Sequence, residues 1–295
     1  MNIKLIGGNG FIGSHVYDVL KNDHDVTIID IGKSVGNHPY SHCDIVEDPN
    51  RLIDLLKGAD AVYLFTAISE ASKNQEDPTN AVAVNIVGLH NVLAACVKND
   101  VKRIVFSSTG WVYSECFENT VDEDTALDLN SGTNFYSATK ICGEVLVRSY
   151  QKCFGLDYTI LRYGTIYGEG MNPRTAVNAF LTNACAGETI RINSNGYRNF
   201  IHVSDIAQGI GDVTLRFEAT KNQTINLDGD EAISLLDVVK YIGEKIPDLN
   251  VVCLSSNVVE FKGKQIVLEK SKKLLQFTQK VSLRKWIHSQ IDEKL

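Results

Sequence analysis

The sequence lacks a long apolar run, because no stretch approaches the roughly 20 consecutive apolar residues that cross a bilayer. It also lacks a signal peptide, since Met1 leads at once into the short apolar segment Ile3-Lys4-Leu5-Ile6. Neither an internal repeat nor a low-complexity linker is present. These absences predict a chain that does not enter a membrane, and we expect it in the cytoplasm.

The sequence also has fewer basic than acidic residues. The chain carries 29 Lys and Arg against 36 Asp and Glu, a formal net charge of −7 at pH 7. A nucleic-acid surface needs a basic face to neutralise phosphates, so this balance argues against nucleic acid as a partner. The 7 cysteines are odd in number and include no Cys-x-x-Cys pair. They predict free thiols in a reducing compartment rather than a disulfide framework.

Short apolar runs alternate with helical patterns in the first half of the chain. Runs of consecutive Val, Ile, Leu and Phe predict strands buried on both faces, at Asn2–Ile6, Asp25–Asp30, Ala61–Phe65, Arg103–Ser107 and Tyr158–Arg162. Helices are predicted between them at Gly13–Asn22, Asn50–Lys57, Thr79–Asn99 and Phe135–Phe154. This alternation predicts an α/β fold with a doubly wound parallel sheet.

The alternation loosens after Tyr163, where several glycines and Pro173 interrupt it. We therefore predict a boundary at this point. Residues 1–163 form the domain of the parallel sheet, and residues 164–295 form mainly a smaller, mixed α/β lobe. Some segments of the second part are expected to return to the first domain.

A glycine-rich turn, Gly7-Gly8-Asn9-Gly10-Phe11-Ile12-Gly13, joins the first strand to the first helix. Two glycine motifs fit this segment: Gly7-x-x-Gly10-x-x-Gly13 and Gly8-x-Gly10-x-x-Gly13. In both cases glycines permit a tight turn, let a pyrophosphate approach the backbone, and bring the helix close to the strand. Asp30 ends the second strand and can accept hydrogen bonds from the adenosine ribose. The pattern predicts a dinucleotide site that takes NAD rather than NADP; a turn without a ligand is the alternative.

A tyrosine and a lysine lie four residues apart at Tyr136 and Lys140, on one face of a predicted helix. A nearby cation lowers the pKa of a phenol, so Tyr136 is a candidate proton acceptor. The same spacing occurs at Tyr17–Lys21 and Tyr241–Lys245. Only Tyr136 follows a strand whose carboxyl end carries hydroxyl groups, at 107–109, where ligands bind in such sheets.

Several segments together resemble the extended short-chain dehydrogenase/reductases of the NAD-dependent epimerase/dehydratase family. Their order along the chain is also that of the family. They are Gly7–Gly13 with Asp30, Asn85–Asn91, Phe106–Tyr113, Tyr136–Lys140 with Glu144, Leu161–Gly168, Arg198–Asp205, and Ser271-Lys-Lys with Ser282-Leu283. The resemblance implies a Rossmann domain that binds NAD, a second lobe that binds a nucleotide sugar, and a homodimer.

The resemblance also implies roles for individual residues. The catalytic set falls on Thr109, Tyr136 and Lys140. Cofactor contacts fall on Gly7, Gly10, Phe11, Ile12, Gly13, Asp30, Asp44, Ile45, Phe65, Ala67, Asn85, Ser107, Tyr136 and Lys140. Substrate contacts fall on Ser108, Thr109, Thr165 and Arg198, with Arg174 as a further candidate phosphate contact.

Some positions depart from the family pattern. Gly110 and Trp111 stand where family dehydratases carry an Asp-Glu pair and related decarboxylases an acid, so both chemistries are disfavoured. Gly164-Thr165 replaces the usual Asn after the Leu-Arg-Tyr strand, which leaves that substrate contact open.

These patterns predict an NAD-dependent nucleotide-sugar 4-epimerase. The alternatives are an NAD(P)H-dependent reductase of 4-keto sugars, a 4,6-dehydratase, and a dinucleotide-binding sensor without catalysis. No metal site is expected, because Pro39 lies between His38 and His42 and the neighbouring Cys43 completes no ligand set.

Overall fold

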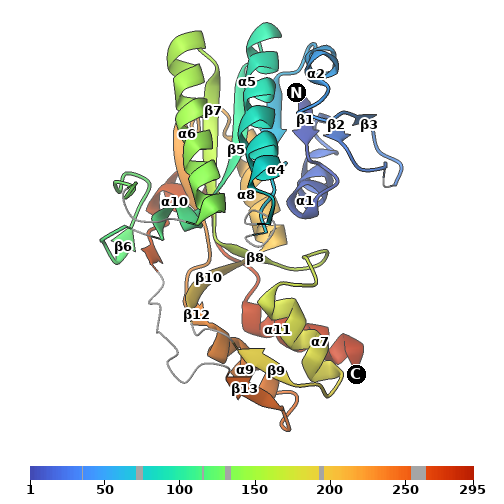
Figure 1. Ribbon diagram of the computed structural model, residues 1–295, viewed down its shortest axis with the longest axis vertical. Coiled ribbons are helices and arrows are strands. Elements are labelled where there is room, and N and C mark those ends of the chain that lie inside the picture. Colours follow the sequence, from blue (N-terminus) through green and yellow to red (C-terminus); the bar gives the residue numbers. More distant parts are fainter. Residues whose placement is uncertain (35, 71–75, 115, 130–133, 193–195, 254–263) are drawn as a thin grey trace.

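The structure is a computed structural model that describes residues 1–34, 36–70, 76–114, 116–129, 134–192, 196–253 and 264–295. The chain forms two unequal parts (Figure 1). A large sheet flanked by helices makes the upper part, and smaller sheets with three helices make the lower part. The carboxyl ends of the large sheet's strands face the lower part, as ligand sites of doubly wound sheets require.

The large sheet has seven parallel strands in the order β11-β7-β5-β4-β1-β2-β3. They are β1 (Asn2–Ile6), β2 (Asp25–Asp30), β3 (Tyr40–His42), β4 (Ala61–Leu64), β5 (Arg103–Thr109), β7 (Asp157–Tyr163) and β11 (Gln223–Leu227). All five predicted strands are confirmed, and so is the doubly wound Rossmann fold. The sequence did not predict β3 and β11, because these edge strands are short or alternate with polar residues.

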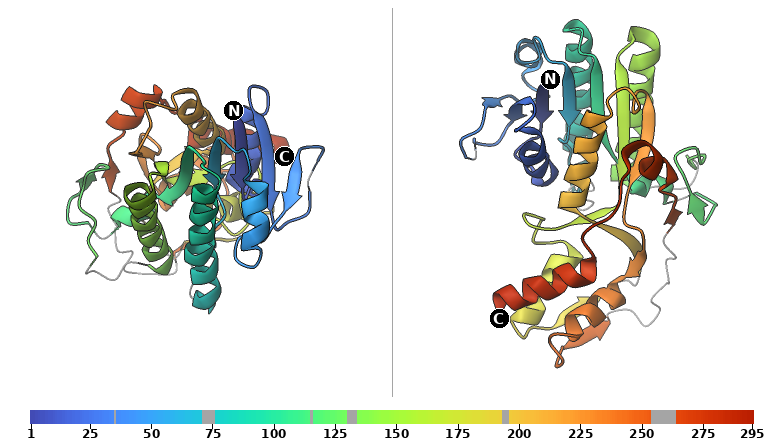
Figure 2. Two further views of the ribbon diagram at one scale, coloured as in Figure 1. Left: turned by 90° about the horizontal axis from the view of Figure 1, so that it is seen from above. Right: turned by 180° about the vertical axis from the view of Figure 1, so that it is seen from behind.

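Helices cover both faces of this sheet (Figures 1 and 2). One face packs against α2 (Pro49–Leu55), α5 (Leu89–Lys98) and α6 (Phe135–Phe154). The other face packs against α1 (Phe11–Leu20), α8 (Val203–Leu215) and α10 (Glu269–Leu275). Successive strand residues point to opposite faces. In β5, Val105 accordingly joins the core under α1 and α8, whereas Ile104 and Phe106 join the core under α5 and α6.

The stretch Pro78–Lys98 is a continuous helix of 21 residues. It consists of α4 (Pro78–Val82), a π-helical turn η1 (Ala83–Gly88) and α5. Among the residues that the structure describes, this is the one helix long and apolar enough to cross a membrane by length and composition. That finding corrects the expectation that no such stretch exists. The helix packs against the sheet, where Val92 and Leu93 are fully buried.

The lower part is built around a third apolar core. Its strands are β8 (Thr165–Tyr167), β10 (Tyr197–His202) and β12 (Ala232–Ser234) in one sheet, and β9 (Ile190–Ile192) with β13 (Val251–Cys253) in another. Its helices are α7 (Ala176–Cys185), α9 (Leu235–Gly243) and α11 (Leu283–Lys294). The chain between β10 and β12 returns to the large sheet as α8 and β11, so residues after 163 contribute to both parts.

Two short segments lie beside the carboxyl ends of β5 and β7. A 3₁₀ turn, η2 (Gly110–Tyr113), directly follows β5. The strands β6 (Thr120–Val121) and β14 (Gln265–Ile266) pair to form a two-stranded ribbon. Both segments border the space between the two parts of the molecule, and there they line a pocket.

Candidate active site

The glycine-rich turn has no room for a side chain at Gly7 or at Gly13. Gly7 has a φ of +80°, and a Cβ atom there would lie 2.6 Å from the backbone nitrogen of Thr66. A Cβ atom on Gly13 would lie 2.5 Å from the carbonyl oxygen of Gly7. Gly10 is the residue before the first turn of α1. The tight turn is therefore made at Gly7, which decides between the two interpretations of the motif.

The turn leaves backbone N–H groups of the first helical turn, at Phe11 and Ile12, without partners inside α1. Asp30 stands beside it at the end of β2. Its Oδ2 accepts from the backbone N–H of Asn9 at 3.0 Å, and its Oδ1 accepts from that of Gly32 at 2.9 Å. Helix N–H groups suit a pyrophosphate, and a carboxylate held in this way suits ribose hydroxyls. These residues fit NAD.

The remaining predicted cofactor contacts follow β3 and β4. Asp44 accepts through Oδ1 from the backbone N–H of Val46 at 2.7 Å, and Ile45 is buried. Phe65 and Ala67 are half-buried after β4. The structure brings these four residues to the edge of the sheet that carries the glycine turn.

Asn85 joins the segment after β4 to α6. Its side chain accepts from the backbone N–H of Ile68 at 2.8 Å and donates to the carbonyl of Ile68 at 3.1 Å and to Thr139 Oγ1 at 3.0 Å. Asn85 is 5% exposed. Asn85 therefore holds the backbone at Ile68, beside the predicted cofactor site, in place against α6.

Thr109, Tyr136 and Lys140 meet at the carboxyl end of β5. The Lys140 ammonium donates to the carbonyl of Ser107 at 2.7 Å and lies 5.8 Å from the centre of the Tyr136 ring. Thr109 Oγ1 accepts from the backbone N–H of Trp111 at 3.3 Å. The start of α6 is tied to the same turn, because Ser137 Oγ donates to the carbonyl of Trp111 at 3.2 Å.

The pKa of Tyr136 differs from the sequence expectation. Burial raises it, whereas a neighbouring lysine was expected to lower it. The physical reason is desolvation of the phenol itself. Lys140 is buried as well, and desolvation lowers its pKa to about 8 although Glu144 acts in the opposite direction. Without a further positive charge, the phenol therefore keeps its proton at neutral pH.

Ser108 does not lie where the sequence placed it. Its hydroxyl donates to Glu144 Oε1 at 2.6 Å and is buried under α6. Alternation along β5 directs Ser107 and Thr109 to one face of the sheet and Ser108 to the other. The prediction of Ser108 as a substrate contact is therefore corrected, because this residue supports the strand from behind.

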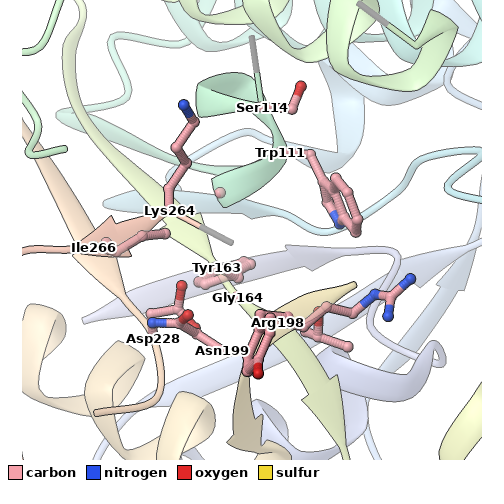
Figure 3. Close-up of a pocket in the computed structure, with 12 residues that line it drawn as sticks. Trp111, Ser114, Tyr163, Gly164, Arg198, Asn199, Asp228, Lys264 and Ile266 are labelled. Carbon is pink, nitrogen blue, oxygen red and sulfur yellow. The ribbon is translucent and has the colours of Figure 1, made fainter. Parts of the chain in front are cut away.

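A pocket opens between the two parts of the molecule (Figure 3). It begins at Gly110, the residue after Thr109, and Thr109, Tyr136 and Lys140 are not themselves among its lining residues. It is lined by η2, the end of β7, the residue after β11, and residues of β8, β10 and β14. The lining residues are Gly110, Trp111, Ser114, Tyr163, Gly164, Thr165, Tyr197, Arg198, Asn199, Asp228, Lys264 and Ile266. Two predicted substrate contacts, Thr165 and Arg198, are among them.

Arg198 brings a positive charge to this pocket. Its guanidinium carbon lies 6.0 Å from the centre of the Trp111 ring, and Nη1 donates to the carbonyl of Gly196 at 3.3 Å. Burial lowers the pKa of this guanidinium. No carboxylate in the described part of the chain forms an ion pair with it, so it is available to an anionic ligand.

Arg174 lies elsewhere. It is 77% exposed and is not part of the pocket lining. Its Nη1 lies 3.6 Å from Glu70 Oε2, and Asn172 donates to Glu70 Oε1 at 2.6 Å. These contacts join the segment after β4 to the segment before α7, across the gap between the two parts.

The sequence predicted no role for most residues of this pocket, and three of them matter for its chemistry. Trp111 and Tyr163 lie within the quoted motifs but were given no role. Asp228 was not noticed, because it follows β11, a strand that the sequence did not reveal. Its carboxyl group is the one acidic side chain among the described residues that line the pocket.

No metal-binding group of three or more His, Cys, Asp or Glu residues occurs in the described ranges. The sequence cluster around residue 40 is separated in space. The ring of His38 packs against Tyr17 with ring centres 5.1 Å apart, and Cys43 is buried.

The model of the NAD-dependent epimerase/dehydratase family matches residues 3–227 of the chain. The chain belongs to this family. It is therefore an NAD-dependent enzyme, as the sequence predicted. A relative from Bacillus subtilis strain 168, named uncharacterized UDP-glucose epimerase YtcB, is 31% identical over 261 residues, which cover 82% of this chain and 81% of the relative.

Two further relatives show how broad the family's chemistry is. The crystal structure of UDP-glucuronic acid 4-epimerase from Bacillus cereus, in complex with UDP-glucuronic acid and NAD, superposes with a TM-score of 0.87 at 25% identity and covers 100% of this chain and 99% of that one. UDP-N-acetyl-α-D-glucosaminuronate decarboxylase of Bacillus cytotoxicus strain DSM 22905 is 30% identical over 260 residues, 81% of this chain and 78% of the relative. Similarity alone thus identifies the family but not the reaction.

Proposed function

We propose that this member of the family is a nucleotide-sugar 4-epimerase. The observation that carries the proposal is the convergence of Thr109, Tyr136 and Lys140 at one strand end, beside a pocket with a free guanidinium. Such a set performs proton transfer at an alcohol while its carbon is oxidised and then reduced. NAD, when bound, supplies the hydride acceptor and donor for this exchange and, in its oxidised form, a positive charge.

Each protein group has a distinct task in the proposed reaction. Tyr136 takes the proton from the sugar 4-hydroxyl, and Thr109 holds the same oxygen by a hydrogen bond as charge develops on it. The Lys140 ammonium is fixed by the carbonyl of Ser107 and opposes the effect of burial on the phenol. The 4-keto sugar turns in the pocket so that C4 would be reduced on its opposite face, and Tyr136 returns the proton to the same oxygen.

The nucleotide is held on the side of the second lobe. Among the described residues, the Arg198 guanidinium has no carboxylate partner, and the residue is half-buried, as a contact for a diphosphate should be. Thr165 lies on the same wall of the pocket. Arg174, which is 77% exposed, is a second phosphate contact in this proposal.

The local chemistry favours epimerisation over elimination. Loss of water from a sugar needs one group to remove a proton from carbon and another to protonate the leaving hydroxyl. Gly110 and Trp111 provide neither, and Asp228 is the one carboxyl group among the described residues lining the pocket. Epimerisation needs no such pair.

The Tyr136→Phe variant tests this proposal. We expect turnover of nucleotide sugars to fall by about 10²–10⁴-fold, because the proton acceptor is lost, with NAD content unchanged. Tyr241→Phe is the matched control, since Tyr241 in α9 and Lys245, which follows that helix, have the same spacing and lie outside the pocket lining. Turnover of Tyr136→Phe at the wild-type rate, on a panel of UDP-, dTDP- and GDP-sugars, would exclude the mechanism.

The cofactor content of the purified protein separates the alternatives. An epimerase regenerates its cofactor at each turnover, so NAD should remain bound through purification and no NADH should be consumed. Stoichiometric consumption of NADH with a 4-keto sugar would identify a reductase, and a 4-keto-6-deoxy product a dehydratase. Binding of NAD without turnover of any sugar would identify a sensor.

We further propose that the enzyme is a cytoplasmic homodimer. Exposed apolar side chains occur on the helix Pro78–Lys98 and on α6, two elements that lie side by side in Figure 1. They are Val82, Val87, Val145 and Phe154. A surface of this kind favours helix-to-helix association, and light scattering of the purified protein measures it. All seven cysteines are free, which suits a reducing compartment.

A further inference from the structure

Asp228 lies at the edge of the sheet that carries the catalytic groups. It directly follows β11, whose last residue, Leu227, pairs with Tyr163 at the end of β7. Tyr163 pairs in turn with Thr109 at the end of β5. The parallel register therefore brings Asp228 one residue beyond the level of Thr109, two strands away, and Asp228 and Gly110 both line the pocket.

Gly164 makes room for this carboxyl group, and Gly110 lies beside it. A Cβ atom on Gly164 would lie 1.5 Å from Asp228 Oδ1, so the carboxyl group fills the space that a side chain at 164 would need. A Cβ atom on Gly110 would lie 3.7 Å from Asp228 Oδ2. Oδ2 is thus directed toward the residue that follows Thr109.

Asp228 is 1% exposed and has no cationic partner within the described ranges. Oδ1 accepts from the backbone N–H of Gly229 at 2.8 Å. The ammonium of Lys264 is occupied by the carbonyls of Cys116 and Glu118. Figure 3 shows Asp228 and Ile266 on one side of the pocket and the Arg198 guanidinium on the other.

A buried carboxyl group without a cation binds a proton. Burial accordingly raises the pKa of Asp228 well above its usual value, although the N–H of Gly229 acts in the opposite direction. The neutral group has one O–H donor. Because Oδ1 is held by Gly229, that donor belongs on Oδ2, the oxygen beside Gly110 and the pocket.

We propose that Asp228, as a neutral carboxylic acid, donates a hydrogen bond to the sugar and selects nucleotide sugars whose hexose is uncharged. The proposal rests on the function proposed above and adds the class of sugar. An uncharged sugar offers hydroxyl oxygens that accept from the Asp228 O–H. A uronate placed there would be a desolvated carboxylate without a cation beside it, because the Lys264 ammonium is held by two backbone carbonyls, and burying an unpaired charge weakens binding.

Two substitutions at this position separate hydrogen bonding from packing. Asp228→Asn keeps the shape, the acceptor for Gly229 and a donor in place of Oδ2–H. Asp228→Leu has similar size and no donor. Asp230→Asn is the matched control, because Asp230 is 48% exposed and forms an ion pair with Lys272 outside the pocket.

The first experiment measures binding of UDP-glucose, UDP-glucuronic acid and UDP to the NAD-loaded protein by calorimetry. We expect Asp228→Leu to lose about 10- to 100-fold in affinity for UDP-glucose and Asp228→Asn to stay within about 3-fold of wild type. UDP should bind all variants equally. Wild type should bind UDP-glucuronic acid at least about 10-fold more weakly than UDP-glucose.

The second experiment observes the proton itself. The infrared carbonyl stretch of a protonated carboxylic acid should be present at pH 7 in wild type and in Asp230→Asn, and absent in both Asp228 variants. Absence of this band in wild type, or equal affinity of Asp228→Leu and wild type for UDP-glucose, overturns the proposal. Neither readout needs turnover, so a failure here is distinct from a wild-type rate in Tyr136→Phe, which overturns the 4-epimerase function.

Discussion

Two buried carboxyl groups, Glu144 and Asp228, lie near the carboxyl ends of the same strands and have opposite surroundings. Glu144 is on α6, where it accepts from the guanidinium of Arg162 at 2.9 and 2.7 Å and from Ser108 at 2.6 Å. Among the described residues, Asp228 accepts one hydrogen bond, from the backbone N–H of Gly229, and it lines the pocket. Both are about 1% exposed. Burial alone therefore does not decide the charge of a carboxyl group; its partners do.

The two groups consequently differ in what they can do. Burial raises the pKa of Glu144, but the hydrogen bonds and charge of Arg162 outweigh it and lower the pKa below its usual value. Glu144 is thus a fixed anion that joins α6 to β5 and β7. Asp228 holds a proton and no cation, which leaves it a donor for a ligand. One carboxyl group belongs to the scaffold, and the other to the pocket.

The largest effect is expected when the Glu144 ion pair is broken. Glu144→Gln leaves Arg162 buried and without its anion, and we expect a loss of about 3–5 kcal/mol in the free energy of unfolding. Urea denaturation of the NAD-loaded protein measures it. Asp228→Asn, at equal burial and at about pH 4, should cost less than about 1 kcal/mol, since it removes no charge. Equal losses for the two variants would show that the contrast between the sites is not real.

The next effect concerns the space that Gly164 leaves. Gly164→Ala places a Cβ atom 1.5 Å from Asp228 Oδ1, so we expect a cost of about 1–3 kcal/mol in the free energy of unfolding. In an Asp228→Ala background the clash is absent, and most of that cost should disappear, which a double-mutant cycle measures. Gly243→Ala is the control, because its Cβ atom would meet Leu249 at an ordinary 3.6 Å. Additive effects of the two substitutions would contradict the packing described here.

The two groups should also give opposite pH dependences of stability. The folded-state pKa of Glu144 is lowered, so its stabilisation is present above the unfolded pKa of about 4.3 and is lost as pH falls through the folded value. The folded-state pKa of Asp228 is raised, so ionisation of the unfolded chain opposes folding as pH rises above about 3.9.

Asp228→Asn should therefore gain stability relative to wild type as pH rises from about 4, by up to about 1.4 kcal/mol per pH unit until Asp228 ionises. Melting temperatures of both proteins between pH 4 and pH 8, approximate limits of a usual stability window, measure the difference. A constant difference across this range would mean that Asp228 is ionised in the folded state.

The smallest effect is expected at Arg148, the outer partner of Glu144. Its guanidinium donates to Glu144 Oε2 at 2.9 Å and to Thr224 at 3.0 Å, but the side chain is 39% exposed. Arg148→Gln should cost about 0–1 kcal/mol in the free energy of unfolding, less at high salt, since water screens this pair. A loss as large as that of Glu144→Gln would mean that Arg148, rather than Arg162, is the main cationic partner of Glu144.

Much of the Rossmann domain could be predicted from the sequence, because its signals are local. The strands β1 and β2 and the helix α6 have the predicted bounds, since buried parallel strands form apolar runs and α6 has a capped start at Asn134 and a glycine end at Gly155. The family motifs also identified the family correctly. Edge strands such as β11 have no comparable run and were missed.

The sequence by itself determined which groups are available: the glycine turn with Asp30, the Thr109/Tyr136/Lys140 set, and the absence of an acid at positions 110 and 111. The tertiary structure alone decided their charge and direction. It turned Ser108 away from the ligand, raised the pKa of Tyr136 by burial, and brought Asp228 from another strand to the side of Gly110. Strand order and desolvation cause these outcomes, and neither is encoded in any short stretch of sequence.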